Sequence, residues 1–174
     1  MNATKGAARP GSTMIGSPVG PLLLVARDGA LTGLYLNERA PAKVLVAIDN
    51  DGGPGDADAA VLAAAARQLG EYFDGQRKVF DLPLALGGTS FQRIVWDALL
   101  GIGYGETVSY GQLADQIGRP TAARAVGLAN GRNPVSIIVP CHRVVGSDGG
   151  LTGYGGGLNT KRRLLDLERQ LITG

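Results

Sequence analysis

The chain has 174 residues, of which 44% are hydrophobic and 18% are charged, a composition that fits one packed unit or two small domains and excludes a disordered protein. Its net charge of +2 is compatible with nucleic-acid binding but does not indicate it. No apolar run approaches the roughly 20 residues that span a bilayer, so no membrane partner is expected.

Residues 1–12 lack the apolar core of a secretory signal and are rich in small residues, which predicts a flexible N-terminal tail. Residues 13–86 then predict a small α+β domain. Short aliphatic and β-branched runs separated by turn residues are typical of an antiparallel three-stranded meander. The expected strands cover 13–17, 21–26 and 31–36.

A helix should follow this sheet. Asp58 is expected to cap it, its apolar face repeats at helical spacing as far as Phe73, and Gly75 suits the left-handed residue after a helix end. A further strand, 79–82, is expected to rejoin the sheet. This domain shows no chemistry of its own.

Residues 87–174 predict a second, mostly helical domain. Thr89 with Gln92 forms a capping-box pattern at the start of one helix, and Ser109 with Gln112 forms a second. In such a box the first side chain accepts from the backbone amide three residues on, and the second side chain reaches back. Both helices therefore have well-defined expected starts.

The next helix is expected over 122–129, capped by Thr121 after a three-residue break at 118–120. Two short helices across a tight turn are typical of a helix-turn-helix. Apart from Arg124 this helix has almost no long side chain, which does not suit reading of the major groove. Its small residues would let the helix approach the minor groove, with Arg124 as a wedge into the base stack. Alternatively, they pack this helix against the first domain.

The only cysteine and the only histidine of the chain are adjacent, as Cys141 and His142. No internal disulfide can form, which favours a reducing, cytoplasmic location, and a Cys/His zinc site is excluded. We therefore expect no metal and no cofactor. A neighbouring base and the cation of Arg143 can make a thiolate available, whereas an isolated cysteine among aliphatic residues is more often an inert buried thiol.

The β-branched run 137–139 before Pro140 predicts an extended, buried segment. Adjacent side chains on extended backbone point to opposite sides. Proton transfer from the Cys141 thiol to the His142 ring is therefore expected to need a bridging water.

The last helix, from Asn159 onward, places Glu168 in the middle of its apolar stripe. A carboxylate on a buried face needs a partner, and His142 is one candidate. The alternative is a rotated helix in which Glu168 pairs with Lys161 or Arg169 at the surface.

A glycine-rich stretch over 149–157 lacks the Lys-Ser/Thr ending of a phosphate-binding loop. It fits either a lid with Tyr154 as a stacking ring or an ordinary mobile surface loop.

Five segments resemble, in order and spacing, the O6-alkylguanine-DNA alkyltransferase family. They are 105–114 (GETVSYGQLA), 122–127 (AARAVG), 133–134 (NP), 140–144 (PCHRV) and 153–156 (GYGG). The resemblance is close from about Phe91 to Glu168 and looser over the first domain. It implies a ribonuclease H-like first domain and a winged-helix-like second domain. It also implies DNA repair by a single irreversible transfer of the alkyl group from O6-alkylguanine, and from O4-alkylthymine, to Cys141.

The resemblance implies a role for each candidate residue. Cys141 would attack the alkyl carbon, His142 would take the thiol proton through water, Glu168 would hold the histidine, Asn133 would brace the turn, and Tyr110 would assist proton donation to the leaving guanine. The expected DNA contacts come from Arg124, Tyr110, Ala123, Ala125, Gly127, Thr121 and Ser147. The expected substrate pocket comes from Val144, Tyr154 and Gly155, together with the carbonyl of Cys141. The partner would be double-stranded DNA, bound through its minor groove by a nucleoid-associated monomer, and whether copies bind cooperatively is open.

Some members of the family carry a zinc site or a fused methyl-sensing domain, which the single cysteine and histidine cannot build. Gly155 stands where some members have a hydroxyl or alanine side chain, and Ser136 stands where some have proline, so tolerance for bulky alkyl groups is open.

Two other functions fit part of the pattern. A Cys-His hydrolase does not explain the small-residue helix, and a non-enzymatic sensor of alkylated bases needs no nucleophile.

Overall fold

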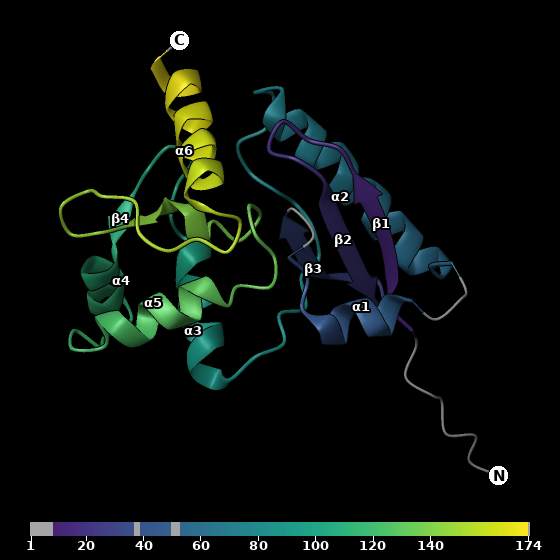
Figure 1. Cartoon of the computed structure of the whole chain (residues 1–174), viewed down its shortest axis with the longest axis horizontal. Coiled ribbons are helices and arrows are strands. Elements are labelled where there is room, and N and C mark those ends of the chain that lie inside the picture. The colour runs from purple at the N-terminus through teal and green to yellow at the C-terminus, as the bar shows by residue number, and fades with distance from the viewer. Residues whose placement is uncertain (1–8, 37–38, 50–52, 174) are drawn as a thin grey trace.

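The computed structural model describes residues 9–36, 39–49 and 53–173. Its first half holds a three-stranded sheet and two helices, and its second half is mostly helical (Figure 1). The elements are β1 (Gly11–Ile15), β2 (Leu22–Arg27), β3 (Ala30–Leu36), α1 (Ala42–Ile48), α2 (Asp56–Phe73), α3 (Ser90–Leu100), β4 (Val108–Ser109), α4 (Tyr110–Gln116), α5 (Ala123–Gly131), a 3₁₀ turn (Cys141–Arg143), β5 (Val144–Val145) and α6 (Leu158–Thr173). None of the helices in the described part of the chain is long and apolar enough to cross a membrane.

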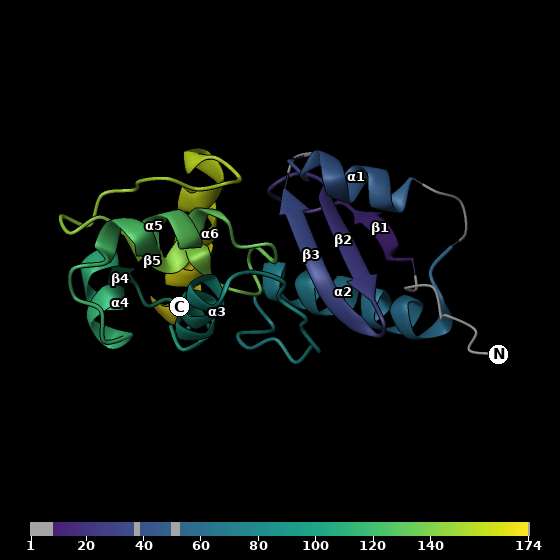
Figure 2. The ribbon, with the colours of Figure 1, turned by 90° about the horizontal axis from the view of Figure 1, so that it is seen from below.

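The sheet is the predicted antiparallel meander, in the order β1-β2-β3. Helix α2 packs on one of its faces, and Figure 2 shows α1 along the opposite side. The β2–β3 hairpin turns through Asp28 and Gly29, whose φ angles are both positive (53° and 78°), as a tight two-residue hairpin requires. Strand β1 begins at Gly11, two residues inside the stretch expected to form the tail, whereas residues 1–8 lie outside the described residues.

The predicted helix cap at Asp58 is wrong. Helix α2 begins at Asp56 with Gly55 as its N-cap, and Asp58 lies within its first turn. The buried Asp58 carboxylate accepts a hydrogen bond from the backbone N–H of Gly29 at 2.8 Å. Its oxygen thus caps the β2–β3 turn from across the fold, which local sequence could not reveal. Gly75, with φ of 77°, follows the helix as predicted.

The strand predicted over 79–82 is also wrong. The backbone there is held by the buried side chain of Gln68, whose amide donates to the Asp81 carbonyl and accepts from the Asp81 N–H, both at 2.8 Å. Only a single bridge, between Leu31 and Leu84, connects the following residues to the sheet. Helix α1, by contrast, was not predicted; it has no side-chain cap and no buried residue.

In the second half, both predicted capping boxes are confirmed, at the starts of α3 and α4. The predicted cap at Thr121 is wrong, because α5 begins at Ala123 after an N-cap residue, Ala122, that has no side-chain cap. Helix α5 packs mainly on α3 and α4, and the indole N–H of Trp96 donates to the Ala129 carbonyl near its end. The alternative that its small residues pack against the first domain is therefore not supported.

Candidate functional site

The segment between α5 and β5 is a compact loop rather than the predicted extended run. Ile137 has φ of 72°, in the left-handed region that β-branched residues rarely adopt, and Cys141 opens a 3₁₀ turn. Asn133 closes the loop from inside, since its side-chain amide donates to the Val139 carbonyl (2.8 Å) and accepts from the Val135 N–H (3.0 Å). Asn133 thus occupies the bracing position expected of it.

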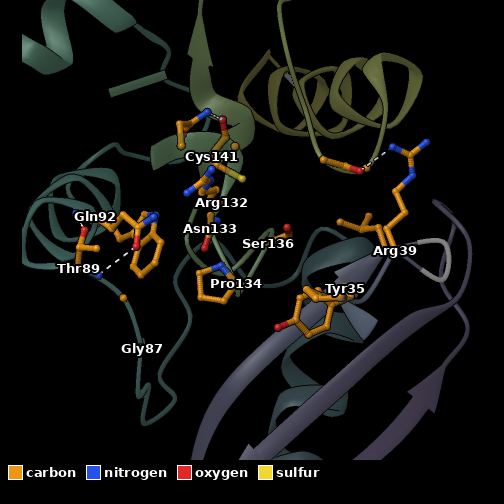
Figure 3. Close-up of a pocket in the computed structure, with 18 of the residues that line it drawn as sticks. Tyr35, Arg39, Gly87, Thr89, Gln92, Arg132, Asn133, Pro134, Ser136 and Cys141 are labelled. Atoms are coloured by element: carbon orange, nitrogen blue, oxygen red, sulfur yellow. Dashed lines mark hydrogen bonds between the residues drawn. The ribbon is translucent and has the colours of Figure 1, made fainter. Parts of the chain in front are cut away.

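Cys141 lies at the wall of a cavity of about 810 Å³ where the two halves of the chain meet. Figure 3 shows it above Asn133 and Ser136, with Tyr35 of β3 on the opposite side. The thiol is only 4% exposed. Burial raises its pKa, against the opposing effects of Asn133, Lys161 and Ser136. The resting nucleophile is therefore a protonated thiol that needs a base.

His142 follows Cys141 directly in the chain. The His142 ring is fully buried, and its Nε2 lies 2.7 Å from Oε1 of Glu168. Burial lowers the pKa of His142, although the bond to Glu168 acts in the opposite direction. An ionised carboxylate only accepts hydrogen bonds, so the proton of the neutral ring sits on Nε2. Its Nδ1 is buried and has no partner among the described residues, so it is left as a free acceptor.

Glu168 is fully buried, so the alternative of a surface pairing is wrong. Besides His142 it accepts from Arg143 through Nε (3.0 Å) and Nη2 (2.8 Å), from the Tyr72 hydroxyl (2.8 Å) and from the Gly105 N–H (3.2 Å). Burial alone would raise its pKa, but the bonds from His142 and Arg143 lower the pKa of Glu168 to about 2. The carboxylate therefore stays ionised around neutral pH.

Sequence reasoning missed part of this network. No pattern in the sequence singles out Tyr72, and the sequence indicates Arg143 only as a cation beside the thiol. Arg143 is itself buried and also donates to the Ile102 carbonyl at 2.7 Å. The adjacency of Arg143 to His142 was the one available signal that both could serve the same carboxylate.

The glycine-rich segment 149–157 is held at two points. The Thr152 carbonyl accepts from the Tyr110 hydroxyl (3.0 Å) and from the Lys161 ammonium (2.9 Å). The Gly155 carbonyl accepts from Arg39 of the first half at 2.8 Å (Figure 3). Burial raises the pKa of Tyr154, whose hydroxyl finds no partner within the described chain. These contacts fit a lid over the cavity better than a free surface loop.

Most of the residues expected to touch DNA lie on α5 or directly before it, whereas Tyr110 begins α4 and Ser147 follows β5. Thr121, Arg124, Ala125 and Ser147 are exposed, and Ala123 and Gly127 are half-buried. A side chain at Gly127 would come within 3.6 Å of the Tyr110 ring, so these two expected contacts are neighbours. Among the described residues, no group of three or more Cys, His, Asp or Glu could hold a metal ion.

Two protein-family models match the chain. The ribonuclease-like domain of 6-O-methylguanine DNA methyltransferase matches residues 12–86, and the DNA binding domain of the same family matches residues 90–170. A methylated-DNA–protein-cysteine methyltransferase of Mycobacterium tuberculosis H37Rv is 54% identical over 157 residues, covering 89% of this chain and 90% of its own. Its namesake from Methanosarcina acetivorans is 49% identical over 152 residues, covering 87% and 94%.

Solved structures of named alkyltransferases are also similar to this chain. The crystal structure of the Mycobacterium tuberculosis O6-methylguanine methyltransferase superposes with a TM-score of 0.82 at 51% identity, covering 92% of this chain and 93% of that one. A complex described as Mycobacterium tuberculosis OGT with DNA superposes with a TM-score of 0.80, also at 51% identity, covering 91% and 92%.

The network around Glu168 predicts a loss of stability in acid. The folded-state pKa values of Glu168 and His142 both lie below their usual values of 4.5 and 6.5, so the unfolded chain binds each proton first. The free energy of unfolding should therefore fall as the pH drops below 6.5, and fall again between about 4.5 and 2. Urea denaturation between pH 3 and 7 measures it.

Glu168→Gln should lose about 3–5 kcal/mol at pH 7, because it leaves Arg143 buried without its charge partner. In this variant the free energy of unfolding should also fall less steeply as the pH drops below 4.5. Glu71→Gln, which removes a carboxylate from a pair of surface ion bridges, is the matched control and should change little. A Glu168→Gln variant as stable as the unmodified protein would contradict this description of the site.

Proposed function

The chain belongs to the O6-alkylguanine-DNA alkyltransferase family, and we propose that Cys141 is the residue that takes the alkyl group. The protein repairs DNA by direct damage reversal, as a methylated-DNA–protein-cysteine methyltransferase that acts once per molecule. One observation carries the proposal: the single cysteine of the chain lies at the wall of the cavity, beside a buried neutral histidine and an ionised glutamate. No other thiol is present to accept the group.

The proton of the thiol leaves through His142. A water that bridges the Cys141 sulfur and the unpartnered Nδ1 of His142 would carry it, while Glu168 stabilises the imidazolium that forms. The sulfur then attacks the alkyl carbon. A carbon–sulfur bond forms as the bond between that carbon and O6 of guanine breaks, and the electron pair leaves with the base. Tyr110 assists the proton donation that neutralises the leaving guanine.

The product explains why each molecule is used once. A thioether has no sulfur–sulfur bond for a thiol to exchange, so cellular thiols cannot regenerate Cys141. The network around Glu168 can move a proton, but it offers no second nucleophile to remove the alkyl group. The protein is therefore consumed in proportion to the damage that it repairs.

DNA is the partner, and we propose that α5 enters its minor groove. Helix α5 presents the small Ala125 and the long Arg124 to solvent, a shape that suits a narrow groove. An enzyme that reacts at a base edge must take the base out of the stack. Arg124 would fill the space left behind, while Thr121 and Ser147 contact phosphates.

The flipped base would then sit beside Cys141. The carbonyls of Cys141 and Val144 would accept from its exocyclic amine, the Gly155 N–H would donate to its edge, and the Tyr154 ring would pack on its face. O4-alkylthymine would react by the same attack. We further propose that the protein acts as a monomer in the cytoplasm, at the chromosome, with residues 13–86 and 87–174 as its two domains.

The transfer itself can be observed by intact-protein mass spectrometry after mixing with a duplex that carries one O6-methylguanine. We expect a single methyl-sized gain in mass, absent from Cys141→Ala and absent with undamaged DNA. A gain that persists in Cys141→Ala would place the acceptor elsewhere. Binding to the damaged duplex with no gain would reduce the protein to a sensor.

Arg124 should matter only where a base stack must be opened. Arg124→Ala is expected to slow transfer from a duplex on the order of 10- to 100-fold, because unstacking a base step costs a few kcal/mol. Transfer from the same oligonucleotide as a single strand should change little. Arg27→Ala, which removes an exposed arginine at the end of β2, is the control for net charge. Equal slowing of the two substrates would argue against a wedge.

A further inference from the structure

Two backbone carbonyls beside the nucleophile each accept a hydrogen bond from a buried side chain. The Cys141 carbonyl accepts from the side-chain amide of Asn130 at 3.3 Å, and the Val144 carbonyl accepts from the ammonium of Lys161. These are the two carbonyls that, in the proposed function, read the exocyclic amine of guanine. The Cys141 carbonyl also accepts from the backbone N–H of Val144 at the end of the 3₁₀ turn, so its direction is fixed by two donors.

The side chain of Asn130 is buried and held in a defined position. It is 3% exposed, lines the cavity that contains Cys141, and follows Ala129, whose carbonyl is fixed by the Trp96 indole. A carbonyl can only accept, so Nδ2 of Asn130 must be the atom that faces Cys141. Its Oδ1 has no partner in the described part of the chain, an arrangement that costs free energy in a buried site. A leucine at this position would avoid the free-energy cost of burying an unpartnered amide oxygen.

Lys161 is likewise less favourable to bury than an aliphatic side chain. Its side chain is fully buried in α6, and its ammonium donates to the Thr152 carbonyl of the lid as well as to Val144. Burial lowers the pKa of Lys161, while the neighbouring Cys141 acts in the opposite direction. An aliphatic side chain would avoid the desolvation of a charge. The two bonds instead fix Val144 and the lid relative to each other.

We propose that Asn130 and Lys161 are positioning residues that hold the carbonyls of Cys141 and Val144 in the orientation that reads the exocyclic amine of guanine. The proposal rests on the function proposed above and adds the origin of its base preference. Neither side chain needs to touch the substrate. Each acts by preventing a peptide plane from turning its oxygen away from the base.

The consequence is a preference among alkylated bases. O6-Methylguanine carries the amine, whereas O6-methylhypoxanthine has the same ring and the same methyl group without it. With the second base neither oriented carbonyl would gain a hydrogen bond from the substrate, so transfer should be slower by about tenfold or more. O4-methylthymine also lacks this amine and should be a poorer substrate for the same reason.

Single-turnover rate constants for the two purine substrates, each in the same duplex, test the proposal. The unmodified protein should prefer O6-methylguanine, and Asn130→Leu should reduce the ratio of the two rate constants several-fold by slowing that substrate selectively. Lys161→Met should also reduce this ratio, because it removes the donor that holds the Val144 carbonyl. The ratio of the two rate constants, measured on one preparation, does not depend on the fraction of folded protein, and Asn130→Asp provides a second variant of unchanged size if the leucine variant folds poorly.

Arg124→Ala is the matched control, since it should slow both substrates by the same factor and leave the ratio intact. No transfer by the unmodified protein would refute the proposed function itself. Transfer at equal rates from both bases would refute the reading of the amine. A wild-type preference that survives unchanged in Asn130→Leu, Asn130→Asp and Lys161→Met would overturn the positioning role while leaving the proposed function standing.

Discussion

The structure depends on one buried negative charge, that of Glu168. A carboxylate without water must be surrounded by donors, and these come from distant parts of the chain: Tyr72 on α2, Gly105 before β4, and His142 and Arg143 in the 3₁₀ turn. The requirement to satisfy this group ties the first half of the molecule to the second. It also fixes the ring of the only histidine beside the only cysteine.

The same constraint sets the state of the reacting groups. Burial disfavours charge on both the thiol and the imidazole, so the resting site holds a neutral pair beside an ionised glutamate. A proton can move from the thiol to the imidazole only when the charges it creates find partners. In the proposed mechanism Glu168 stabilises the cation, and bond formation to the alkyl carbon consumes the thiolate. The thiol of the resting site is therefore protonated.

Local patterns in the sequence predicted the features that neighbouring residues decide. The meander, the two capping boxes and the start of α6 all follow from spacing and residue type, whereas the apolar stripe of α6 left the burial of Glu168 open. The errors arose where distant residues decide. Asp58 caps a hairpin rather than its own helix, and Gln68 replaces a strand partner for Asp81. Ile137 adopts a left-handed conformation inside a loop that Asn133 closes, so its β-branched neighbourhood was misleading. The charges of Arg143 and Lys161 gave no hint of their burial, because their partners lie elsewhere in the chain.

In the resting site His142 is neutral, with its proton on Nε2 toward Glu168 and its Nδ1 without a partner among the described residues. Because the chain has a single histidine, ¹⁵N NMR of protein labelled only at histidine reports this ring alone. At pH 7 we predict one protonated nitrogen, assigned to Nε2, and one nitrogen with the chemical shift of a bare acceptor, assigned to Nδ1. On titration with acid, the midpoint for protonation of the ring should lie below the usual pKa of 6.5. A charged imidazolium at pH 7, or a proton on Nδ1, would contradict this assignment, because in neither state could Nδ1 accept the proton of Cys141.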